Sequence, residues 1–133
     1  MCIRDSHNHK AFSVLVNGYT LWAGTANGIN RGIMINEWQE VTPGNFQLFN
    51  CIEWVHYTYQ NADLSGNFVV GLAKQLWNGG TTIWAATMNA DTPGEVRGLS
   101  YTRDGGQTWK TTLLGERIYN ITCLLYTSDA ADE

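Results

Sequence analysis

Short apolar runs separated by turn residues make up most of the chain. No segment keeps an apolar period of 3.6 residues over three turns, so the pattern does not predict helices. Asn-Gly and Asp-Gly steps supply the positive φ that tight hairpin turns require. Four such steps each follow an apolar run: Asn17-Gly18 after residues 12–16, Asn27-Gly28 after 21–25, Asn78-Gly79 after 68–77 and Asp104-Gly105 after 98–102. The pattern predicts an all-β chain of short antiparallel strands.

One strand motif occurs twice. Residues 19–25 read Tyr-Thr-Leu-Trp-Ala-Gly-Thr and residues 81–87 read Thr-Thr-Ile-Trp-Ala-Ala-Thr, so both contain apolar-Trp-Ala-small-Thr. Further along, Trp38 is predicted to correspond to Trp109, and the second copy is expected to carry an insertion around residues 88–96. Each copy predicts four short antiparallel strands, the last of which begins near a tryptophan.

A four-stranded repeat of this kind is typical of the blade of a β-propeller. One blade cannot bury both of its faces alone, and radial stacking of blades buries them. We expect a fragment of a β-propeller with blades at about residues 11–65 and 66–116, and the first strand of a third blade at residues 117–122. A β-sandwich is the competing architecture, but it does not predict the repeated motif.

The two ends of the chain are expected to be unrelated to the fold. With suitable codons, the reverse complement of the DNA for residues 1–6 (MCIRDS) translates as CLLYTS, the sequence of residues 123–128. The string resembles the mosaic-end adapter of transposase-based sequencing libraries, and DAADE looks like its continuation. We therefore interpret residues 1–6 and 123–133 as adapter-derived and exclude them from fold reasoning. Residues 7–122 are then expected to be part of a longer β-propeller.

This exclusion changes the charge and the cysteine count. Lys plus Arg falls from 8 to 7 and Asp plus Glu from 12 to 8, so the net charge changes from −4 to −1. The remaining basic residues are scattered, which argues against a nucleic-acid partner. No apolar run is long enough to span a membrane. Cys51 is the only cysteine left, so we expect it to be buried and expect no internal disulfide.

Residues 102–109 read Thr-Arg-Asp-Gly-Gly-Gln-Thr-Trp and agree with every defined position of the pattern Ser/Thr-x-Asp-x-Gly-x-Thr-Trp. This pattern is the Asp box, or BNR repeat, and the chain resembles bacterial BNR/Asp-box (sialidase-like) β-propellers. The same box is found in xyloglucanase-like, sortilin-like and photosystem-assembly-factor-like propellers. Residues 21–29 instead resemble blades of two-component-regulator propellers, and residues 32–38 lack the Asp-Gly pair. The resemblance implies an architecture, and it implies an extracellular, cell-surface or periplasmic location.

We expect the Asp box to be structural rather than catalytic. The Asp104 carboxylate is predicted to accept the N–H groups of Gly106 and Gln107, as in an Asx turn. Gly105 and Gly106 permit left-handed backbone dihedrals. The two threonines of the box are expected to face each other across the hairpin, and Trp109 is expected to enter the core between blades. The structural set is Thr102, Asp104, Gly105, Gly106, Thr108 and Trp109.

Two further regions are candidates for contact with a glycan or a protein. Trp54, Tyr57 and Tyr59 could form a platform on which sugar rings stack, or they could fill space between blades. Asn89 and Asp91 lie in a polar loop inserted into the second copy, and propellers use such loops for binding. No catalytic, metal or cofactor site is predicted, because no arginine, tyrosine or carboxylate falls in a motif that assigns it a sialidase role.

The sequence therefore predicts a structural or interaction module of a larger, secreted bacterial propeller, without catalysis in this fragment. Its partners would be the remaining blades of the same chain and an unknown protein or glycan. One alternative is a piece of a sialidase-like or xyloglucanase-like glycoside hydrolase whose catalytic groups lie on other blades. A second alternative is the sensor propeller of a signalling protein. Both alternatives are analogies of fold, which do not establish an activity.

Overall fold

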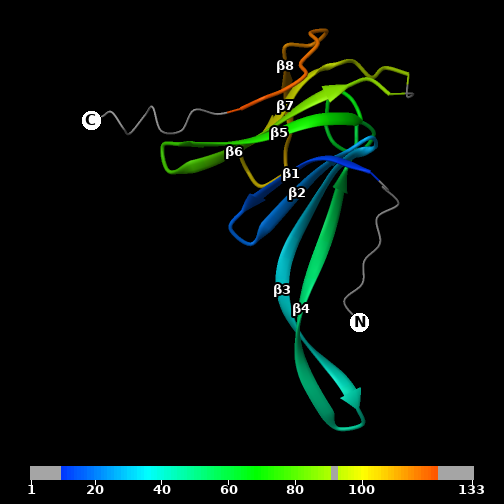
Figure 1. Ribbon diagram of the computed structural model, residues 1–133, viewed down its shortest axis with the longest axis vertical. Helices are drawn as coiled ribbons and strands as arrows, with labels where there is room; N and C mark the ends of the chain where they lie inside the picture. The colour runs from blue at the N-terminus through cyan, green and yellow to red at the C-terminus, as the bar shows by residue number, and fades with distance from the viewer. Residues whose placement is uncertain (1–9, 91–92, 123–133) are drawn as a thin grey trace.

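The computed structural model describes residues 10–90 and 93–122 (Figure 1). Within these ranges the chain forms strands and no helix, as the turn pattern predicts. No helix of the described part is therefore long and apolar enough to cross a membrane. The strands are β1 (Ala11–Asn17), β2 (Thr20–Thr25), β3 (Gly28–Thr42), β4 (Asn45–Tyr57), β5 (Phe68–Trp77), β6 (Gly80–Met88), β7 (Gly98–Thr102) and β8 (Lys110–Thr112).

These strands form two four-stranded sheets, each with its strands side by side in chain order. The first sheet has the order β1-β2-β3-β4 and the second β5-β6-β7-β8. Every neighbouring pair is antiparallel. The prediction of two four-stranded antiparallel sheets is confirmed. The interpretation of residues 1–6 and 123–133 as adapter-derived concerns residues outside the described ranges and stays a prediction.

The register of the strands shows the repeat in three dimensions. Directly opposed residues of antiparallel strands lie on the same face of a sheet, so each row of partners marks one face. Trp22 and Trp84 occupy the same place in their rows. The rows are Leu15, Trp22, Arg31 and Val55 in the first sheet, and Ala73, Trp84, Tyr101 and Lys110 in the second.

The same register corrects the predicted match between Trp38 and Trp109. Val55 and Lys110 close the two rows, and Trp54 and Trp109 directly precede them. Trp54 is therefore the counterpart of Trp109. Trp38 lies in the outer part of β3 with 67% of its surface exposed, whereas Trp109 is 4% exposed. The prediction was wrong because it counted along the chain, and the long β3–β4 hairpin adds residues that the second sheet does not have.

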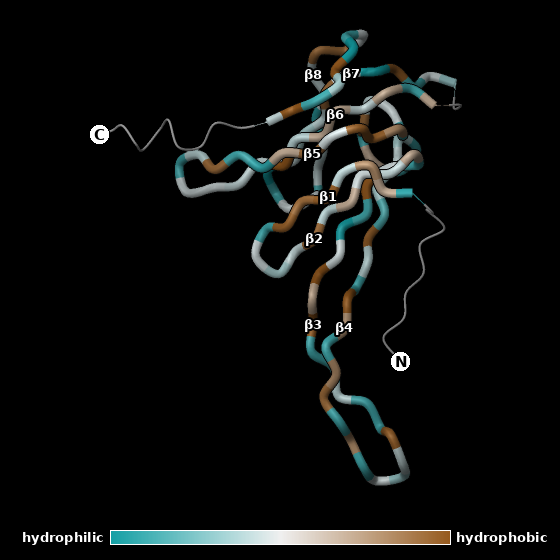
Figure 2. The backbone as a smooth tube through the Cα atoms, in the orientation of Figure 1, coloured by the Kyte–Doolittle hydropathy of each residue, from teal (hydrophilic) through white to brown (hydrophobic). Residues whose placement is uncertain are grey.

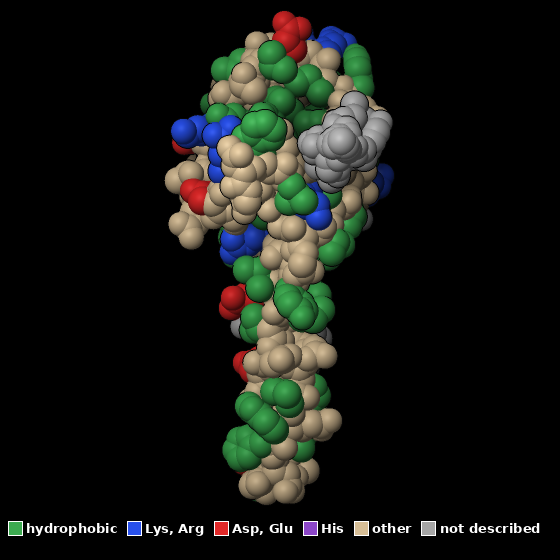
Figure 3. All heavy atoms as spheres, turned by 90° about the vertical axis from the view of Figure 1, so that its left-hand side faces the viewer, with side chains coloured by type: hydrophobic (Ala, Val, Ile, Leu, Met, Phe, Trp, Pro, Cys, Tyr) green, Lys and Arg blue, Asp and Glu red, His purple; other side chains and the backbone are tan. Residues whose placement is uncertain are grey.

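That hairpin is the largest difference between the sheets. β3 has 15 residues and β4 has 13, against 5 in β7 and 3 in β8. Its outer half projects from the body as an arm, with no other described element beside it in either view (Figure 1 and Figure 3). Hydrophobic and polar residues both occur along it (Figure 2). Gly44, with a φ of 82°, turns the chain at the tip.

The core lies where the sheets stack, between what we call their inner faces. Gly24 of β2 brings the two backbones close, since a Cβ atom there would lie 3.1 Å from Val69 Cβ. Ser13 and Leu72 join β1 to β5, because the Leu72 N–H donates to Ser13 Oγ at 3.0 Å. Each large apolar side chain buried here stabilises the fold by about 1.5–3 kcal/mol. The core cluster is Trp22, Ile29, Tyr57, Leu64, Val69, Leu72, Ile83, Ala85 and Trp109.

Residues 117–122, predicted to open a third blade, do not form a strand. A strand requires a partner for its backbone N–H and C=O groups, and none of the described strands pairs with this segment. The segment instead crosses the second sheet near Gly71. A Cβ atom on that glycine would lie 3.4 Å from Ile121 Cγ2.

Cys51 lies in β4 and is 4% exposed, as expected for a buried cysteine. It is disulfide-bonded. The expectation of no internal disulfide concerned residues 7–122, in which Cys51 is the only cysteine, and it stays a prediction.

Candidate functional site

The Asp-box turn, residues 102–109, connects β7 to β8 at the place where the second sheet meets the first. Thr102 ends β7, and Lys110 begins β8 directly after Trp109. The last strand of this unit thus begins beside a tryptophan, as the repeat predicts. The turn therefore holds the position that the long β3–β4 hairpin occupies in the first sheet.

Hydrogen bonds among Thr102, Asp104 and Thr108 close the turn. The Thr108 N–H donates to Asp104 Oδ1 at 2.9 Å, and the Thr108 hydroxyl donates to Asp104 Oδ2. The Thr102 hydroxyl donates to Asp104 Oδ1 at 2.8 Å and accepts the Gly106 N–H at 2.9 Å. This differs from the predicted Asx turn. Because the Thr102 hydroxyl stands between Asp104 and Gly106, it takes the Gly106 N–H, and the carboxylate reaches on to Thr108.

The electrostatics of the turn favour an ionised Asp104. Hydrogen bonds from the Thr108 hydroxyl and then the Thr108 N–H lower the pKa of Asp104 to about 2, with a smaller contribution from Thr102. Hydrogen bonds to a carboxylate stabilise its charged form and are stronger than bonds between neutral groups. The carboxylate accepts hydrogen bonds from Thr102 and Thr108 of its own turn, and these bonds stabilise the turn.

The glycines of the turn let its backbone approach the first sheet. Gly105 and Gly106 have φ values of 75° and 100°, which glycine adopts without steric cost. A Cβ atom on Gly106 would lie 2.5 Å from Tyr57 Oη and 3.2 Å from Trp22 Cη2. Position 106 therefore requires glycine for two reasons. Its φ is positive, and the two aromatic rings of the first sheet leave no room for a Cβ atom.

Arg31 of β3 ties the turn to the first sheet by a polar contact. Its Nη1 donates to the carbonyl oxygen of Gly105. Its guanidinium carbon lies 5.9 Å from the centre of the Tyr57 ring, within range of a cation–π contact. The sequence analysis did not assign Arg31 a role, because its distance of 74 positions from Gly105 has no signature in the sequence.

Three aromatic rings from both sheets pack behind the turn. Trp22 and Tyr57 are stacked with centroids 6.3 Å apart, and Trp109 meets Trp22 edge-on at 6.0 Å and Tyr57 at 5.7 Å. Burial raises the pKa of Tyr57, a shift that Arg31 opposes and Asp104 reinforces. The indole N–H groups of Trp22 and Trp109 are buried without an acceptor among the described residues. The cluster therefore holds the sheets together by ring packing rather than by hydrogen bonds.

The structure does not bring the three residues of the predicted sugar platform together. Tyr57 points to the inner face and is 9% exposed. Trp54, three residues earlier in the same strand, lies on the opposite face because side chains alternate along a strand. There it covers Gly32, on which a Cβ atom would lie 2.8 Å from Trp54 Cζ3. Tyr59 follows the strand and places its hydroxyl against Gly94, on which a Cβ atom would lie 2.6 Å from Tyr59 Oη.

The loop between β6 and β7 is anchored by a residue that the sequence analysis missed. Glu95 is 8% exposed, and its Oε1 accepts the N–H of Asn67 at 2.7 Å and of Ala90 at 3.1 Å. Asn89 is exposed beside this anchor. Asp91, the other predicted contact residue, lies outside the described residues. An acidic residue in a polar loop is expected to face solvent, so the sequence carried no signal for the role of Glu95.

Two clefts flank the Asp-box turn. The larger, about 840 Å³, is lined by both polar and aromatic residues, including Tyr59, Asp63, Tyr101 and Trp109. The smaller, about 320 Å³, runs along the turn itself beside Gln107. Among residues 10–90 and 93–122, no three His, Cys, Asp or Glu side chains gather closely enough to hold a metal ion.

Comparisons with known proteins add no relative. No family model, no curated protein and no solved structure matches the chain.

Proposed function

We propose that this chain is a structural and interaction module of a larger, secreted bacterial β-propeller of the BNR/Asp-box type, with its two sheets as adjacent blades. In this proposal the Asp-box turn is a clip that fixes the second blade on the first. The observation that carries it is the close packing of Gly106 against Trp22 and Tyr57, together with the hydrogen bond from Arg31 to the Gly105 carbonyl.

The arrangement of the sheets supports the blade interpretation. Each sheet is a meander in chain order, and the sheets share the register around Trp22 and Trp84. The first strands of the two sheets lie against each other, since Phe12 stacks on Phe68 with ring centroids 5.0 Å apart. A repeat stacked in this way buries one face of each unit and leaves the outermost faces for further units.

The partners and the location in this proposal follow from the resemblance of the Asp box. The expected partners are other blades of the same protein and an extracellular protein or glycan. The glycoside hydrolase and sensor alternatives stay predictions from the sequence.

The clip is tested with two glycine variants of the complete chain. Gly106→Ala introduces a Cβ against Tyr57, whereas Gly79→Ala introduces one at a comparable φ of 77° with no atom within 4 Å. Both variants place alanine at a positive φ, 100° at position 106 and 77° at position 79, so the main difference is the contact with the first sheet. We expect Gly106→Ala to weaken the near-ultraviolet circular dichroism of the aromatic cluster and to lower the unfolding midpoint much more than Gly79→Ala.

Equal losses of midpoint in the two variants would show that the turn does not clip the sheets. If Gly106→Ala does not fold at all, hydrogen exchange of the wild-type chain decides the matter. The Gly106 amide should then exchange as slowly as the amides of β2 and β7, and fast exchange would refute the clip.

A further inference from the structure

The outer edge of β4 is a long strand edge with no partner strand in residues 10–90 and 93–122. β4 ends the order β1-β2-β3-β4 and pairs with β3 alone. The strand at the same place in the second sheet, β8, has 3 residues and begins with Lys110, whereas β4 has 13 residues with no lysine and no proline. Short length, lysine and proline protect edge strands from pairing with other chains. The edge of β4 has none of these protections.

The register shows which backbone groups of β4 point outward from the sheet. The Met34 N–H donates to the Tyr19 carbonyl oxygen at 3.0 Å, so it points away from β4. In an antiparallel ladder, this direction alternates from residue to residue and is the same for two residues opposite each other without a hydrogen bond. Ile52 is opposite Met34, so its N–H and C=O groups point away from β3. The residues of β4 with outward groups on the arm and at its base are therefore Phe46, Leu48, Asn50 and Ile52.

The side chains beside this edge divide between an apolar face and an acidic face. Trp38 and Leu48 are direct partners and share a face with Phe46. Their exposed fractions are 67%, 45% and 61%. Glu37 and Glu53 are exposed on the opposite face. A strand added to β4 would therefore meet apolar side chains on one face and negative charge on the other.

The charge of this region has one sign. No lysine or arginine lies between Arg31 and Lys74, a stretch that contains the whole arm and the rest of β4. Glu40 is bonded within the tip, where its Oε2 accepts the Gly44 N–H at 2.8 Å. Glu53 lies on β4 itself, so a residue opposite it on an added strand would have its Cβ about 5 Å away. A cation at that position would be attracted.

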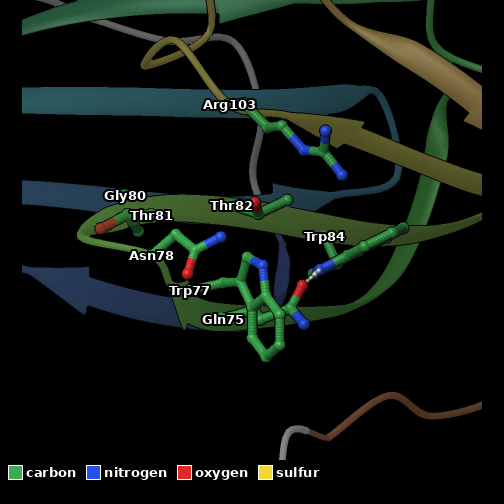
Figure 4. A pocket seen from close by; sticks show the side chains of 8 residues that line it. All are labelled: Gln75, Trp77, Asn78, Gly80, Thr81, Thr82, Trp84 and Arg103. Carbon is green, nitrogen blue, oxygen red and sulfur yellow. Dashed lines mark hydrogen bonds between the residues drawn. The ribbon is translucent and has the colours of Figure 1, made fainter.

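The exposed tryptophans of the second sheet have a different electrostatic environment. A groove of about 550 Å³ there is lined by Trp77 and Trp84 together with polar residues (Figure 4). Trp84 Nε1 donates to Gln75 Oε1 at 2.9 Å, and Arg103 lies across the groove from Gln75. Trp77 is 66% exposed, as Trp38 nearly is. The Arg103 guanidinium repels a basic segment, so charge distinguishes this groove from the edge of β4.

We infer that the outer edge of β4 is a docking site for an extended segment of another protein in which apolar residues alternate with lysine or arginine. Added as a strand, the segment exchanges backbone hydrogen bonds with the edge. Its apolar residues lie beside Leu48 and Ile52, and its basic residues lie beside Glu53. This inference deepens the proposed function, because it names the chemistry of the protein partner. Further blades stacked on the faces of the sheets would leave this edge uncovered.

Two other occupants fit the edge less well. A second copy of this chain, paired edge to edge about a two-fold axis, would bring two acidic faces to the same side of the joined sheet. A membrane surface with anionic lipids would repel Glu37 and Glu53. Both occupants are outcomes that the test separates from the proposed one.

The test uses a fluorescent peptide of about nine residues, a normal strand length, in which valine alternates with lysine. One control peptide has glutamate in place of each lysine, and another has the same composition with the valines and lysines in two blocks. Asn50→Pro and Asn36→Pro are matched variants of the complete chain, because the two asparagines are direct partners. Each proline removes one outward N–H, on opposite edges of the arm, which edge strands tolerate.

We expect the fluorescence anisotropy of the alternating peptide to report binding to the parent chain, with both control peptides at least about fivefold weaker. Asn50→Pro should weaken binding at least about fivefold, and Asn36→Pro less than about twofold. Hydrogen exchange on the parent chain gives the same information if Asn50→Pro perturbs the arm. The peptide should slow exchange of the Leu48 and Ile52 amides and leave the Asn36 amide unchanged.

Several results would overturn the inference. They are no binding of the alternating peptide, equal binding of the three peptides, equal losses in the two proline variants, and unchanged exchange at Leu48 and Ile52. A dimer that protects these two amides without peptide would assign the edge to a second copy. Displacement of the peptide by phosphatidylglycerol vesicles that retain the chain would assign it to lipid. The unfolding midpoints of Gly106→Ala and Gly79→Ala do not depend on the edge of β4, so failure of the docking site is distinguishable from failure of the clip.

Discussion

The first and second sheets contain nearly the same strand motif, yet its tryptophan is buried in one sheet and partly exposed in the other. Trp22 is covered by the Asp-box turn of the neighbouring sheet, whereas no sheet of the described chain covers Trp84. The sheets also differ after the third strand, since one continues as a long hairpin and the other closes through the Asp-box turn. The comparison shows that the strand motif determines on which face of its sheet the tryptophan lies. Whether that tryptophan is buried depends on the neighbouring sheet.

The largest expected effect separates the two tryptophans. Trp22→Ala should reduce the free energy of unfolding by about 3–5 kcal/mol, because it empties a buried site. Trp84→Ala removes the contact with Tyr101 and the hydrogen bond to Gln75, and should cost about 1–2 kcal/mol. Urea unfolding followed by far-ultraviolet circular dichroism measures both. Similar losses would mean that the two faces are packed alike, contrary to the structure.

A smaller effect concerns the turn that distinguishes the second sheet. The pKa of Asp104 is lowered from 3.8 to about 2 by its hydrogen bonds from Thr108. Because the folded pKa lies below the unfolded one, the stabilisation is complete above about pH 4 and is lost as the pH falls towards about 2. Asp104→Asn should lower the melting temperature at neutral pH by roughly 5 °C, and should flatten the decline between those two pH values.

Asp63→Asn is the matched control for that prediction, since it also removes one exposed negative charge. Thermal melts at several pH values compare the two variants with the parent chain. If the melting temperature of the Asp104→Asn variant falls in acid as steeply as that of the parent chain, the hydrogen bonds of the turn do not contribute to stability.

The smallest expected effect concerns the arm of the first sheet. Replacing residues 36–50 by Asn-Gly joins Ile35 to Cys51, which are direct partners in the register. The removed part packs against no other described element, so the free energy of unfolding should change by less than about 0.5 kcal/mol. Urea unfolding checks this. A loss of several kcal/mol would show that the arm supports the sheet, and the comparison of the sheets would have to be redrawn.

Much of the local structure was predictable because it depends on neighbours in the chain. Asn-Gly and Asp-Gly turns lie where the sequence places them, with Gly18 and Gly105 at positive φ. The apolar-Trp-Ala-small-Thr motif also marked β2 and β6 correctly. The length of β3 and β4 was not predictable, because residues of the arm alternate no differently from those that pair inside the body.

The candidate site was predictable only in part. The residues of the Asp-box turn were recognised from their pattern, but the donors of Asp104 were assigned to Gly106 and Gln107 instead of Thr108. The rotamer of the Thr102 hydroxyl decides between these arrangements, and a sequence does not contain it. The sugar platform failed for a simpler reason, since Trp54 and Tyr57 are an odd number of positions apart in one strand and therefore face opposite ways.

By itself, the sequence determined the all-β class, the two four-stranded units and the box that closes the second, because turn chemistry and period-two patterning act over a few residues. Only the tertiary structure decided which face each tryptophan occupies, that Arg31 reaches Gly105, and that Glu95 is an anchor. These contacts join residues far apart in the chain. They depend on how the two sheets stack, which local preferences do not specify.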